Sequence, residues 1–318
     1  MNNIVIFDSG CGGLGVLKEL CLLLGKESRG RKNPNCAKND SVARNGDFRR
    51  RSVSNIRDHV ENPPFRDNQA LLAQSGVIYY GDTANAPYGS KPQTEIAALA
   101  KSAADKLYKY GFKALVVACN TVTGAVIEEL RSRYPDAAVI GAEPALKPAV
   151  VTKEGKILLL ATPATLRQEK FTRLYEQYGD NRIILSPQKD LAFIIEQNFF
   201  DSAHITRYIA YILAPYERED ISGIVLGCTH YTLVKDCFAE ALHLIFKRQI
   251  AIFDGNLGIA RRTADLINPP FSAGQASLVQ SVGFASSQQG RAYVYRDMFF
   301  RLAPELEGKI IVDFPEIF

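Results

Sequence analysis

The sequence predicts an α/β protein made of two pseudo-symmetric α/β domains, with mostly parallel sheets that face a central cleft. Short apolar runs alternate with longer amphipathic stretches along the 318 residues, a pattern typical of βαβ units. Many of these runs end in polar residues, as the ligand-binding strands of parallel sheets do. The pattern also occurs twice: runs ending in FDSG and ACNT in the first half are followed by LLLATPAT and IVLGCTH in the second.

Seven apolar runs are predicted to be strands, because each is short and is followed by turn-forming or polar residues. They are Ile4–Phe7, Val77–Tyr80, Ala114–Ala118, Val139–Ile140, Ile157–Ala161, Ile183–Leu185 and Ile224–Leu226. Helices are predicted between them, including Glu95–Tyr108, Val122–Ser132 and Leu166–Tyr178. Residues 268–290 carry few signals, whereas Arg296–Phe318 is predicted to form a helix and a final strand.

The duplicated pattern predicts a first domain of residues 1–142 plus 250–318 and a second domain of residues 143–249. Residues 26–70 contain eleven Lys/Arg and six Asp/Glu, so this segment accounts for the whole net charge of +4. It has few apolar residues and no sustained period, which predicts a disordered surface insertion. Contact with nucleic acid through Arg49, Arg50 and Arg51 is the alternative. The segment lacks interleaved aromatic residues, so we expect no nucleic-acid binding.

Composition restricts the class of protein further. The six cysteines form no C-x-x-C pair and the four histidines are scattered, which favours reduced thiols over disulfides or a metal site. The N-terminal residues MNNIVIFDSG have no basic region before the apolar run, so we expect no signal peptide. No apolar run approaches the roughly 20 residues that a membrane span needs. These features predict a cytoplasmic protein.

A glycine-rich segment, Gly10-Cys11-Gly12-Gly13-Leu14-Gly15, matches G-x-G-x-x-G after a strand. This is the fingerprint of dinucleotide binding, which also expects an acidic residue at the end of a second strand about 20 residues on. Here the chain enters the basic insertion instead, so we do not predict a dinucleotide cofactor. The loop is expected to offer backbone N–H groups to a carboxylate or phosphate.

Two cysteines, Cys119 and Cys228, follow matched strands in the two halves. Racemisation at a carbon acid needs a base on one face of the substrate and an acid on the other. A cysteine can serve as either, since its ordinary pKa of about 8.5 is lowered by suitable surroundings. A single buried cysteine is more often a small core residue, but two in matched contexts favour catalysis. We predict that they act on opposite faces of one substrate.

Polar neighbours of the cysteines fit the same chemistry. Asn120, Thr121 and Thr229 are candidate donors to substrate carboxylates. His230 is a candidate assistant to Cys228, and Asp8 to Cys119, in proton transfer. A Cys-His hydrolase built on Cys228 and His230 is an alternative, but it gives no role to a second cysteine.

Six segments together resemble glutamate racemase: FDSGCGGLGVL, YYGDTANAPYGSKP, VVACNT, VIGAEPALKPA, ATPATLR and VLGCTHY. The resemblance implies a two-domain fold, no pyridoxal phosphate or metal, a role in supplying D-glutamate for peptidoglycan, and a homodimer. By resemblance, Cys119 deprotonates D-glutamate and Cys228 L-glutamate, with Asp8, His230 and Glu196 as auxiliaries. The implied substrate contacts are Asp8, Ser9, Tyr88, Gly89, Asn120, Thr121, Thr229 and His230, and Asp82 lies in a matching motif.

The sequence departs from the family pattern at two places. The insertion lengthens the separation of Asp8 from Asp82, and Thr232 stands where proline commonly follows the tyrosine. Two other functions stay open: aspartate racemase of the same superfamily, and a binding protein that keeps the fold and acts through the insertion. No role is assigned to the other four cysteines, Cys11, Cys21, Cys36 and Cys237, or to His59, His204 and His243.

Overall fold

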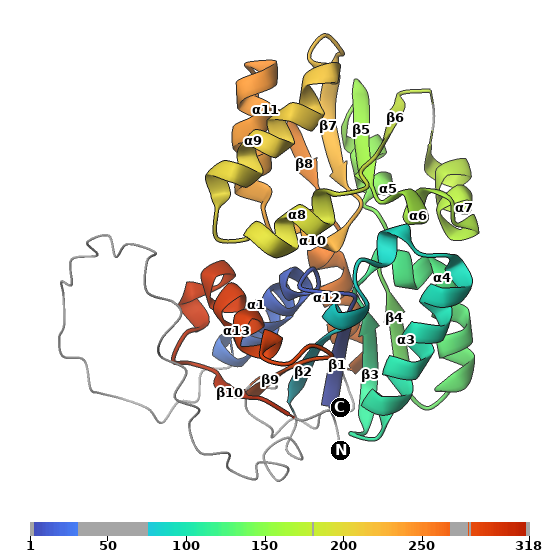
Figure 1. The fold of residues 1–318 in the computed structure, drawn as a ribbon, viewed down its shortest axis with the longest axis vertical. Coiled ribbons are helices and arrows are strands. Elements are labelled where there is room, and N and C mark those ends of the chain that lie inside the picture. Colours follow the sequence, from blue (N-terminus) through green and yellow to red (C-terminus); the bar gives the residue numbers. More distant parts are fainter. Residues whose placement is uncertain (1–2, 31–75, 180, 268–278, 280, 316–318) are drawn as a thin grey trace, which may run out of the picture.

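A computed structural model of the chain describes residues 3–30, 76–179, 181–267, 279 and 281–315. Within them the strands form two sheets, of six and four strands, and each observed pairing is parallel. The strand orders are β10-β9-β2-β1-β3-β4 and β6-β5-β7-β8. In Figure 1 the six-stranded sheet lies in the lower half and the four-stranded sheet in the upper half. The predicted class, two α/β units with parallel sheets, is confirmed.

The seven predicted strands are all present, with ends that differ by three residues at most. The first sheet contains β1 (Asn3–Asp8), β2 (Val77–Gly81), β3 (Phe112–Val117), β4 (Ala138–Gly141), β9 (Ser281–Ser286) and β10 (Ile311–Asp313). The second contains β5 (Lys156–Ala161), β6 (Ile183–Pro187), β7 (Ile221–Leu226) and β8 (Ala251–Phe253). The segment 268–290 carries few signals in the sequence, yet it contains β9, a mostly buried strand beside β2.

Helices cover both faces of each sheet (Figure 1). The first sheet carries α1 (Leu14–Gly30), α3 (Gln93–Tyr108), α4 (Asn120–Arg133), α12 (Asn256–Ile267) and α13 (Arg291–Leu302). The second carries α5 (Leu146–Thr152), α6 (Pro163–Leu166), α7 (Glu169–Tyr178), α8 (Leu191–Asn198), α9 (Ser202–Leu213), α10 (Thr229–Thr232) and α11 (Lys235–Phe246).

Two predicted helices have different limits in the structure. The one expected at Leu166–Tyr178 is divided into α6 and α7, because Gln168 turns inward and its Nε2 donates to the backbone oxygen of Thr121 at 2.7 Å. The one expected from Arg296 begins five residues earlier, at Arg291. Both differences arise from contacts with distant residues, which local periodicity does not report.

The central strands are apolar throughout because both faces of each sheet are covered. On β1, Ile4 and Ile6 join the apolar cluster that includes α1. Val5 and Phe7, which point to the opposite face, join the cluster that includes α3 and α4. The first of these clusters continues into α8, α9 and α11 of the other half. The two halves therefore share part of their hydrophobic core.

The duplication is visible at the level of single hydrogen bonds. Strand order β2-β1-β3-β4 repeats as β6-β5-β7-β8. The N–H of Ala118 donates to Phe7 oxygen at 2.9 Å, and the N–H of Gly227 donates to Leu160 oxygen at 2.8 Å. Because Ala118 and Gly227 occupy equivalent positions, the residues that follow them, Cys119 and Cys228, are equivalent as well.

The chain changes sheet between Gly141 and Lys156, and changes back between Phe253 and Ser281. Helix α12 packs against α1, β3 and β4, which are elements of the first half. The exact domain limits at 142 and 250 stay a prediction. Of the predicted insertion at 26–70, residues 26–30 continue the backbone of α1, and the rest, with Cys36 and His59, lies outside the described residues.

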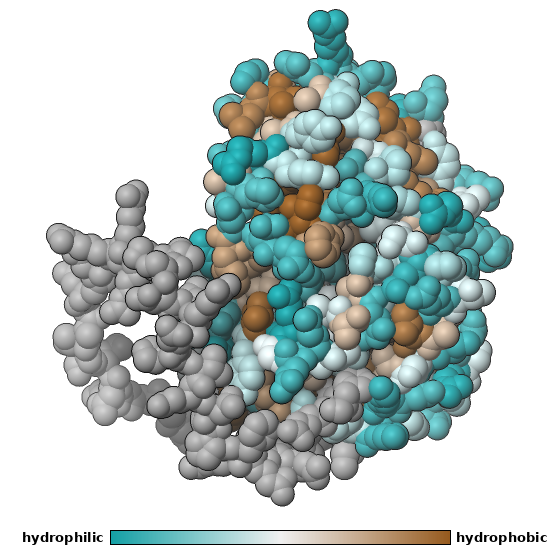
Figure 2. All heavy atoms as spheres, viewed as in Figure 1, coloured by the Kyte–Doolittle hydropathy of each residue, from teal (hydrophilic) through white to brown (hydrophobic). Residues whose placement is uncertain are grey.

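Among the described residues, no helix is both long and apolar enough to cross a membrane. On the face shown in Figure 2 the described surface is mostly hydrophilic, and its hydrophobic residues form small separate patches, several of them over the second-sheet half.

Candidate active site

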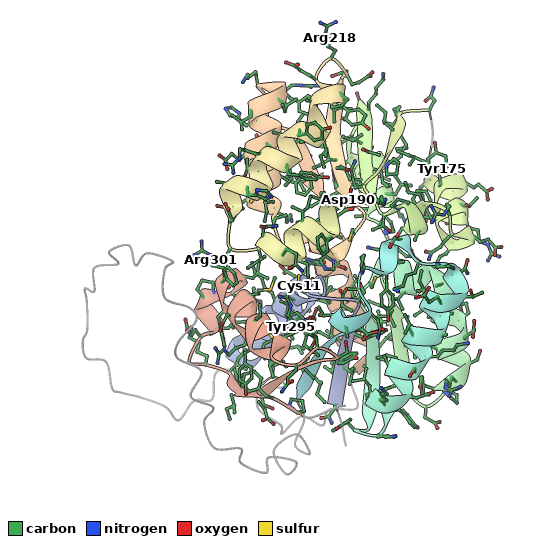
Figure 3. The ribbon with its side chains drawn as sticks, viewed as in Figure 1. Cys11, Tyr175, Asp190, Arg218, Tyr295 and Arg301 are labelled. Atoms are coloured by element: carbon green, nitrogen blue, oxygen red, sulfur yellow. The ribbon has the colours of Figure 1, made fainter. Side chains whose placement is uncertain are left out.

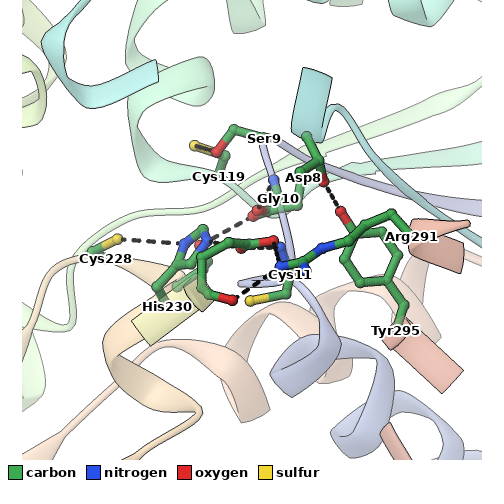
Figure 4. Close-up of polar contacts among 12 residues, drawn as sticks. Asp8, Ser9, Gly10, Cys11, Cys119, Cys228, His230, Arg291 and Tyr295 are labelled. Atoms are coloured by element: carbon green, nitrogen blue, oxygen red, sulfur yellow. Dashed lines mark hydrogen bonds and ion pairs between the residues drawn. The ribbon is translucent and has the colours of Figure 1, made fainter. Parts of the chain in front are cut away.

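The predicted catalytic residues meet where the two sheets point their carboxyl ends at each other (Figure 4). Asp8 ends β1, Cys119 follows β3, and Cys228 follows β7. His230 lies in α10 and Glu196 in α8. All five are buried, and they come from both halves of the chain. A site of this kind is expected at the carboxyl edge of parallel sheets.

Cys119 is the N-cap of the 14-residue helix α4 and is 6% exposed. Its Sγ lies 3.5 Å from Ser9 Oγ. The helix end favours a thiolate, and the sequence suggested a lowered pKa. The structure corrects this: burial and the nearby charge of Asp8 raise the pKa of Cys119 to about 12. In the absence of substrate, Cys119 is therefore a thiol.

Cys228 precedes α10, a helix of only four residues, and is 8% exposed. A helix this short gives little dipole support, but His230 Nδ1 lies 3.9 Å from Cys228 Sγ. Burial disfavours the imidazolium, yet Cys11, Cys228 and Glu196 hold the pKa of His230 well above its usual value. His230 is therefore a cation placed to stabilise a thiolate at Cys228.

Glu196 holds His230 from the other side. Its Oε2 lies 2.7 Å from His230 Nε2 and accepts the N–H of Cys11 at 2.8 Å, and its Oε1 accepts from Arg291 Nη2 at 2.7 Å. Burial opposes ionisation of Glu196, but the hydrogen bond and charge of His230, with those from Cys11 and Arg291, hold its pKa below the usual 4.5. Glu196 is thus an anion between two cations.

Cys11, Glu196 and His230 are also a buried group whose candidate ligand atoms lie within 4.8 Å of one another. A metal ion there would have to displace the hydrogen bonds that already occupy the Glu196 oxygens, and it would lie beside the Arg291 cation. The contacts favour an ion-paired cluster over a metal centre. The expectation of no metal and no cofactor stays a prediction.

Asp8 links the two halves beneath the cysteines. Its Oδ1 accepts the N–H of Gly10 at 2.9 Å, and its Oδ2 accepts Thr229 Oγ1 at 3.0 Å. Burial raises the pKa of Asp8 more than His230 and these hydrogen bonds lower it. A carboxyl with a raised pKa, close enough to influence the Cys119 thiol, is suited to proton exchange.

The segment around Tyr88 and Gly89 approaches from the first half. Tyr88 Oη donates to Asp82 Oδ2 at 2.5 Å, while Tyr80 Oη and Asn85 Nδ2 also donate to this carboxylate. The hydrogen of the Tyr88 hydroxyl is therefore already donated to Asp82. A Cβ on Gly89 would lie 3.0 Å from the Thr162 side chain, so the missing side chain permits close approach to the second half.

A cluster of hydroxyl groups joins the halves on the Cys119 side. Thr121 Oγ1 lies 3.1 Å from both Thr162 Oγ1 and Thr165 Oγ1. Next to it, Asn120 Oδ1 is buried and has no hydrogen-bond partner among the described residues. An unpaired buried acceptor is costly, so this oxygen is positioned for a donor that arrives with a ligand.

The glycine-rich loop has a structural explanation that differs from nucleotide binding. A Cβ on Gly12 would lie 2.3 Å from Thr229 Oγ1 and 2.7 Å from His230 Nδ1. The loop therefore packs its backbone directly against the catalytic turn of the other half.

Sequence reasoning missed several residues of the cluster. Cys11 was assigned no role, yet its N–H binds Glu196 and its thiol lies in the same buried group. Arg291 lies between the signal-poor segment 268–290 and the helix expected from Arg296, and it was given no role. Thr162 and Thr165 occur in the ATPATLR stretch and Gln168 directly follows it, but none of the three was singled out. A glycine-rich loop after a strand was the available signal for Cys11, whereas the sequence gives no comparable signal for Arg291.

Comparisons with known proteins identify the family of the chain. Residues 66–262 match the family model described as Asp/Glu/Hydantoin racemase. A glutamate racemase from Clostridium acetobutylicum is 40% identical over 219 residues, which cover 66% of this chain and 84% of that protein. One from Clostridium botulinum (strain Kyoto) is 44% identical over 193 residues, covering 60% and 73%.

Solved structures show the same fold at lower sequence identity. Escherichia coli glutamate racemase, solved with L-glutamate and the activator UDP-MurNAc-ala, has a TM-score of 0.66 and 21% identity, over 98% of each chain. The Francisella tularensis glutamate racemase, solved with D-glutamate, has a TM-score of 0.65 and 19% identity, over 99% of this chain and 98% of that one. The matched family model and the clostridial relatives together show that the chain belongs to the Asp/Glu/hydantoin racemase family, among its glutamate racemases.

Proposed function

We propose that this chain interconverts L- and D-glutamate by a two-base mechanism in which Cys119 and Cys228 act on opposite faces of the α-carbon. The observation that carries the proposal is the equivalence of the two cysteines. Each follows the same strand of a duplicated sheet, and each is buried beside a residue able to assist proton transfer. Two thiols in equivalent places suit a reaction whose two directions are chemically alike.

With L-glutamate bound, the Cys228 thiolate takes the α-proton while the Cys119 thiol donates its proton to the other face. The products are D-glutamate, a Cys228 thiol and a Cys119 thiolate, so the proton count is unchanged. D-glutamate reacts in reverse and restores the starting state. The carbanion character that develops between the thiols is best stabilised by groups already fixed in place.

The assistants of the two thiols differ because the duplication is not exact in side chains. The position equivalent to His230 is Thr121, and the position equivalent to Asp8 is Ala161. His230, backed by Glu196, favours the thiolate at Cys228. Asp8 stands on the Cys119 side, where it is suited to accept or return the proton of the thiol. Each half-reaction therefore has one assistant of its own.

We expect the substrate to be held by groups of both halves. The unpaired Asn120 Oδ1 is suited to accept from the α-ammonium group. Hydroxyl groups of Ser9, Thr121 and Thr229 and backbone N–H groups around Tyr88 and Gly89 are the proposed donors to the carboxylates. The Tyr88 hydroxyl already donates its hydrogen bond to Asp82. We therefore expect the segment around Tyr88 to bind the substrate through its backbone N–H groups.

The wider role follows from family membership. We propose that the protein works in the cytoplasm as a homodimer, without pyridoxal phosphate or metal, and supplies D-glutamate for peptidoglycan. Aspartate is the alternative substrate, because the same two-thiol chemistry would act on it.

The test is exchange of the α-proton of L- and D-glutamate in D₂O, followed together with optical rotation. Wild type is compared with Cys119→Ser and Cys228→Ser, and with Cys237→Ser as a matched control. Cys237 is a buried cysteine in α11 whose Sγ contacts Ser202 oxygen at 3.7 Å, away from the cluster. We expect each catalytic substitution to abolish racemisation and the control to retain it.

Aspartate is run as a parallel substrate. Activity with aspartate alone would keep the mechanism and change the substrate. Racemisation that survives either catalytic substitution would refute the two-base mechanism, and folded wild type inactive with both amino acids would refute the proposed activity.

A further inference from the structure

Arg291 lies behind the Glu196–His230 pair and makes contacts that no racemisation step uses directly. Its Nη2 donates to Glu196 Oε1 at 2.7 Å and to the backbone oxygen of Glu196 at 2.9 Å. Glu196 contacts His230 at 2.7 Å, and His230 lies 3.9 Å from the Cys228 sulfur. The four groups form a continuous series of contacts, and Figure 4 labels Arg291, His230 and Cys228 of this series.

Aromatic side chains fix Arg291 in this place. Its guanidinium carbon lies 5.9 Å from the ring centre of Tyr295, one turn further along α13. Tyr295 packs edge-on against Tyr79 at 5.4 Å and hydrogen-bonds Thr83. Tyr79 donates to the backbone oxygen of Gly10 at 2.6 Å. The support under Arg291 therefore also holds the loop whose Cys11 N–H binds Glu196.

The position of Arg291 is unfavourable in its own helix. It is the first residue of α13, where the positive end of the helix dipole disfavours a cation. Its side chain is only 18% exposed, and that of Glu196 is 5% exposed. Burial of a charged pair gives little stability compared with apolar packing. Apart from the Tyr295 ring that it covers, the contact that accounts for an arginine here is the carboxylate that it holds.

We propose that Arg291 is a positioning residue for the Cys228 half-reaction: through two hydrogen bonds it fixes the Glu196 carboxylate, which orients His230 and keeps it positively charged beside the thiolate. This inference rests on the proposed racemase function. In this role Arg291, which lies in helix α13 of the first half, helps to position His230, a catalytic group of the second half. Arg291 does not touch the substrate in this role.

Loss of Arg291 has a defined electrostatic consequence. Without the guanidinium, the buried Glu196 anion is less stable, and the imidazolium of His230 that depends on it is lost at a lower pH. Cys228 then loses the positive charge that lies 3.9 Å from its sulfur. The other titratable groups that face this pair are Asp8 of β1, Cys11 of the loop, Cys228, Tyr79 of β2 and Tyr295 of α13. None of these supplies a permanent cation to replace Arg291.

The experiment compares wild type with Arg291→Gln and Arg291→Lys, measuring kcat and KM for both enantiomers across the pH range. The equilibrium constant of a racemisation is one, so each variant must have the same kcat/KM for L- and D-glutamate. This equality is an internal check on the measured constants. For Arg291→Gln we expect a fall in kcat of roughly 10- to 100-fold, as for loss of an oriented acid–base group, with little change in KM. The alkaline limb of the pH profile moves to lower pH and the acid limb to higher pH.

Arg291→Lys should recover much of the loss, because one nitrogen, Nη2, makes both contacts to Glu196. Arg301→Gln is the matched control: it removes the same charge from the exposed far end of α13, apart from Cys11 and Tyr295 in Figure 3. We expect its kcat and pH profile to match wild type.

Different failures are distinguishable. If wild type itself does not racemise glutamate, the proposed function fails. If wild type is active and folded Arg291→Gln keeps both limbs of its pH profile, only the positioning role is refuted, even where thermal stability falls. If Arg291→Gln does not fold, the test relies on Arg291→Lys. The positioning role is supported if the limbs of the Arg291→Lys pH profile move in the directions expected for Arg291→Gln, to a smaller extent. It is refuted if the pH profile and kcat of Arg291→Lys equal those of wild type.

Discussion

At the scale of single residues, the two thiols have nearly equal exposure but opposite electrostatic surroundings. Cys228 faces the His230 cation at 3.9 Å, whereas Cys119 faces the Ser9 hydroxyl and the Asp8 carboxyl. A positive charge therefore lies beside the Cys228 sulfur, whereas burial and the charge of Asp8 raise the pKa of the Cys119 thiol. In the proposed mechanism, these surroundings suit Cys228 to deprotonate L-glutamate and Cys119 to donate the opposing proton.

This asymmetry predicts the order of thiol alkylation. The thiolate is the reactive species, so iodoacetamide near neutral pH should modify Cys228 at least about tenfold faster than Cys119. Peptide mass spectrometry of timed samples measures both rates in one protein. Asp8→Asn should speed the reaction of Cys119, because it removes a charge that raises the pKa of that thiol. Equal rates at the two cysteines would contradict the assignment.

Glu196 gives a second residue-level prediction, which concerns how the free energy of unfolding depends on pH. Its pKa is lowered in the folded state, so the unfolded chain binds the proton more tightly and stability contributed by Glu196 rises with pH. That contribution is present above the usual pKa of 4.5 and is lost as the pH falls below it. The difference in unfolding free energy between wild type and Glu196→Gln should therefore shrink from about pH 6 to about pH 3.5, as urea titrations would measure. A constant difference would contradict the lowered pKa.

The sequence identified the residues of the site that follow strands, and it missed those that support them. Cys119, Cys228 and Asp8 are recognisable because strand ends of a parallel sheet converge, whatever the details of packing. Arg291 and Cys11 act through Glu196, which lies 95 and 185 residues from them. Such contacts depend on how α8, α13 and the first loop pack, and no local spacing reports that.

At the scale of elements, the central strands β1, β2, β5 and β7 were predicted well because they are largely apolar and buried on both faces. Two strands, the three-residue β8 and the longer β9, were not predicted, and β9 is built from SVGFAS, in which small and polar residues weaken the apolar signal. It is nevertheless a strand, because β2 and β10 supply partners on both sides. The division between α6 and α7 likewise arises from a tertiary contact of Gln168.

Two glycines in contrasting elements allow an element-level prediction. A Cβ on Gly12 would collide with Thr229 and His230, whereas a Cβ on Gly258 in α12 meets nothing within 4 Å. Gly12→Ala should displace the catalytic turn and lower kcat/KM about 100-fold, since small misplacements are costly. Gly258→Ala should leave kcat/KM unchanged and raise stability by about 0.5–1 kcal/mol, because alanine restricts the unfolded chain and favours the helix.

Steady-state kinetics and urea unfolding of both variants provide the measurement. Wild-type kcat/KM in Gly12→Ala would show that the loop does not set the position of Thr229 and His230.

At the scale of the whole molecule, the site exists only where the halves meet. Asp8 reaches Thr229, Thr121 reaches Thr162 and Thr165, and Arg291 reaches Glu196, each across the boundary between the two sheets. The sequence predicted this arrangement in outline from its repeated strand-and-cysteine pattern. It could not predict the individual contacts, because the repeats share strand order and hardly any side chains. Since both thiols are more than nine-tenths buried, we expect these contacts to loosen when substrate enters.

A ligand held by both halves should stabilise the whole molecule. The double variant Cys119→Ser/Cys228→Ser converts neither enantiomer of glutamate, so the stabilisation by L- and by D-glutamate can be measured separately. Binding to the folded state alone adds about 2.7 kcal/mol at a ligand concentration of 100 Kd, so both L- and D-glutamate should raise the melting temperature in a concentration-dependent way. Aspartate is one methylene shorter and cannot span the same donors, which costs about 1–3 kcal/mol of binding. Its effect at equal concentration should therefore be much smaller. A larger shift with aspartate would identify it as the preferred ligand, and no shift with either enantiomer of glutamate would contradict a substrate site between the halves.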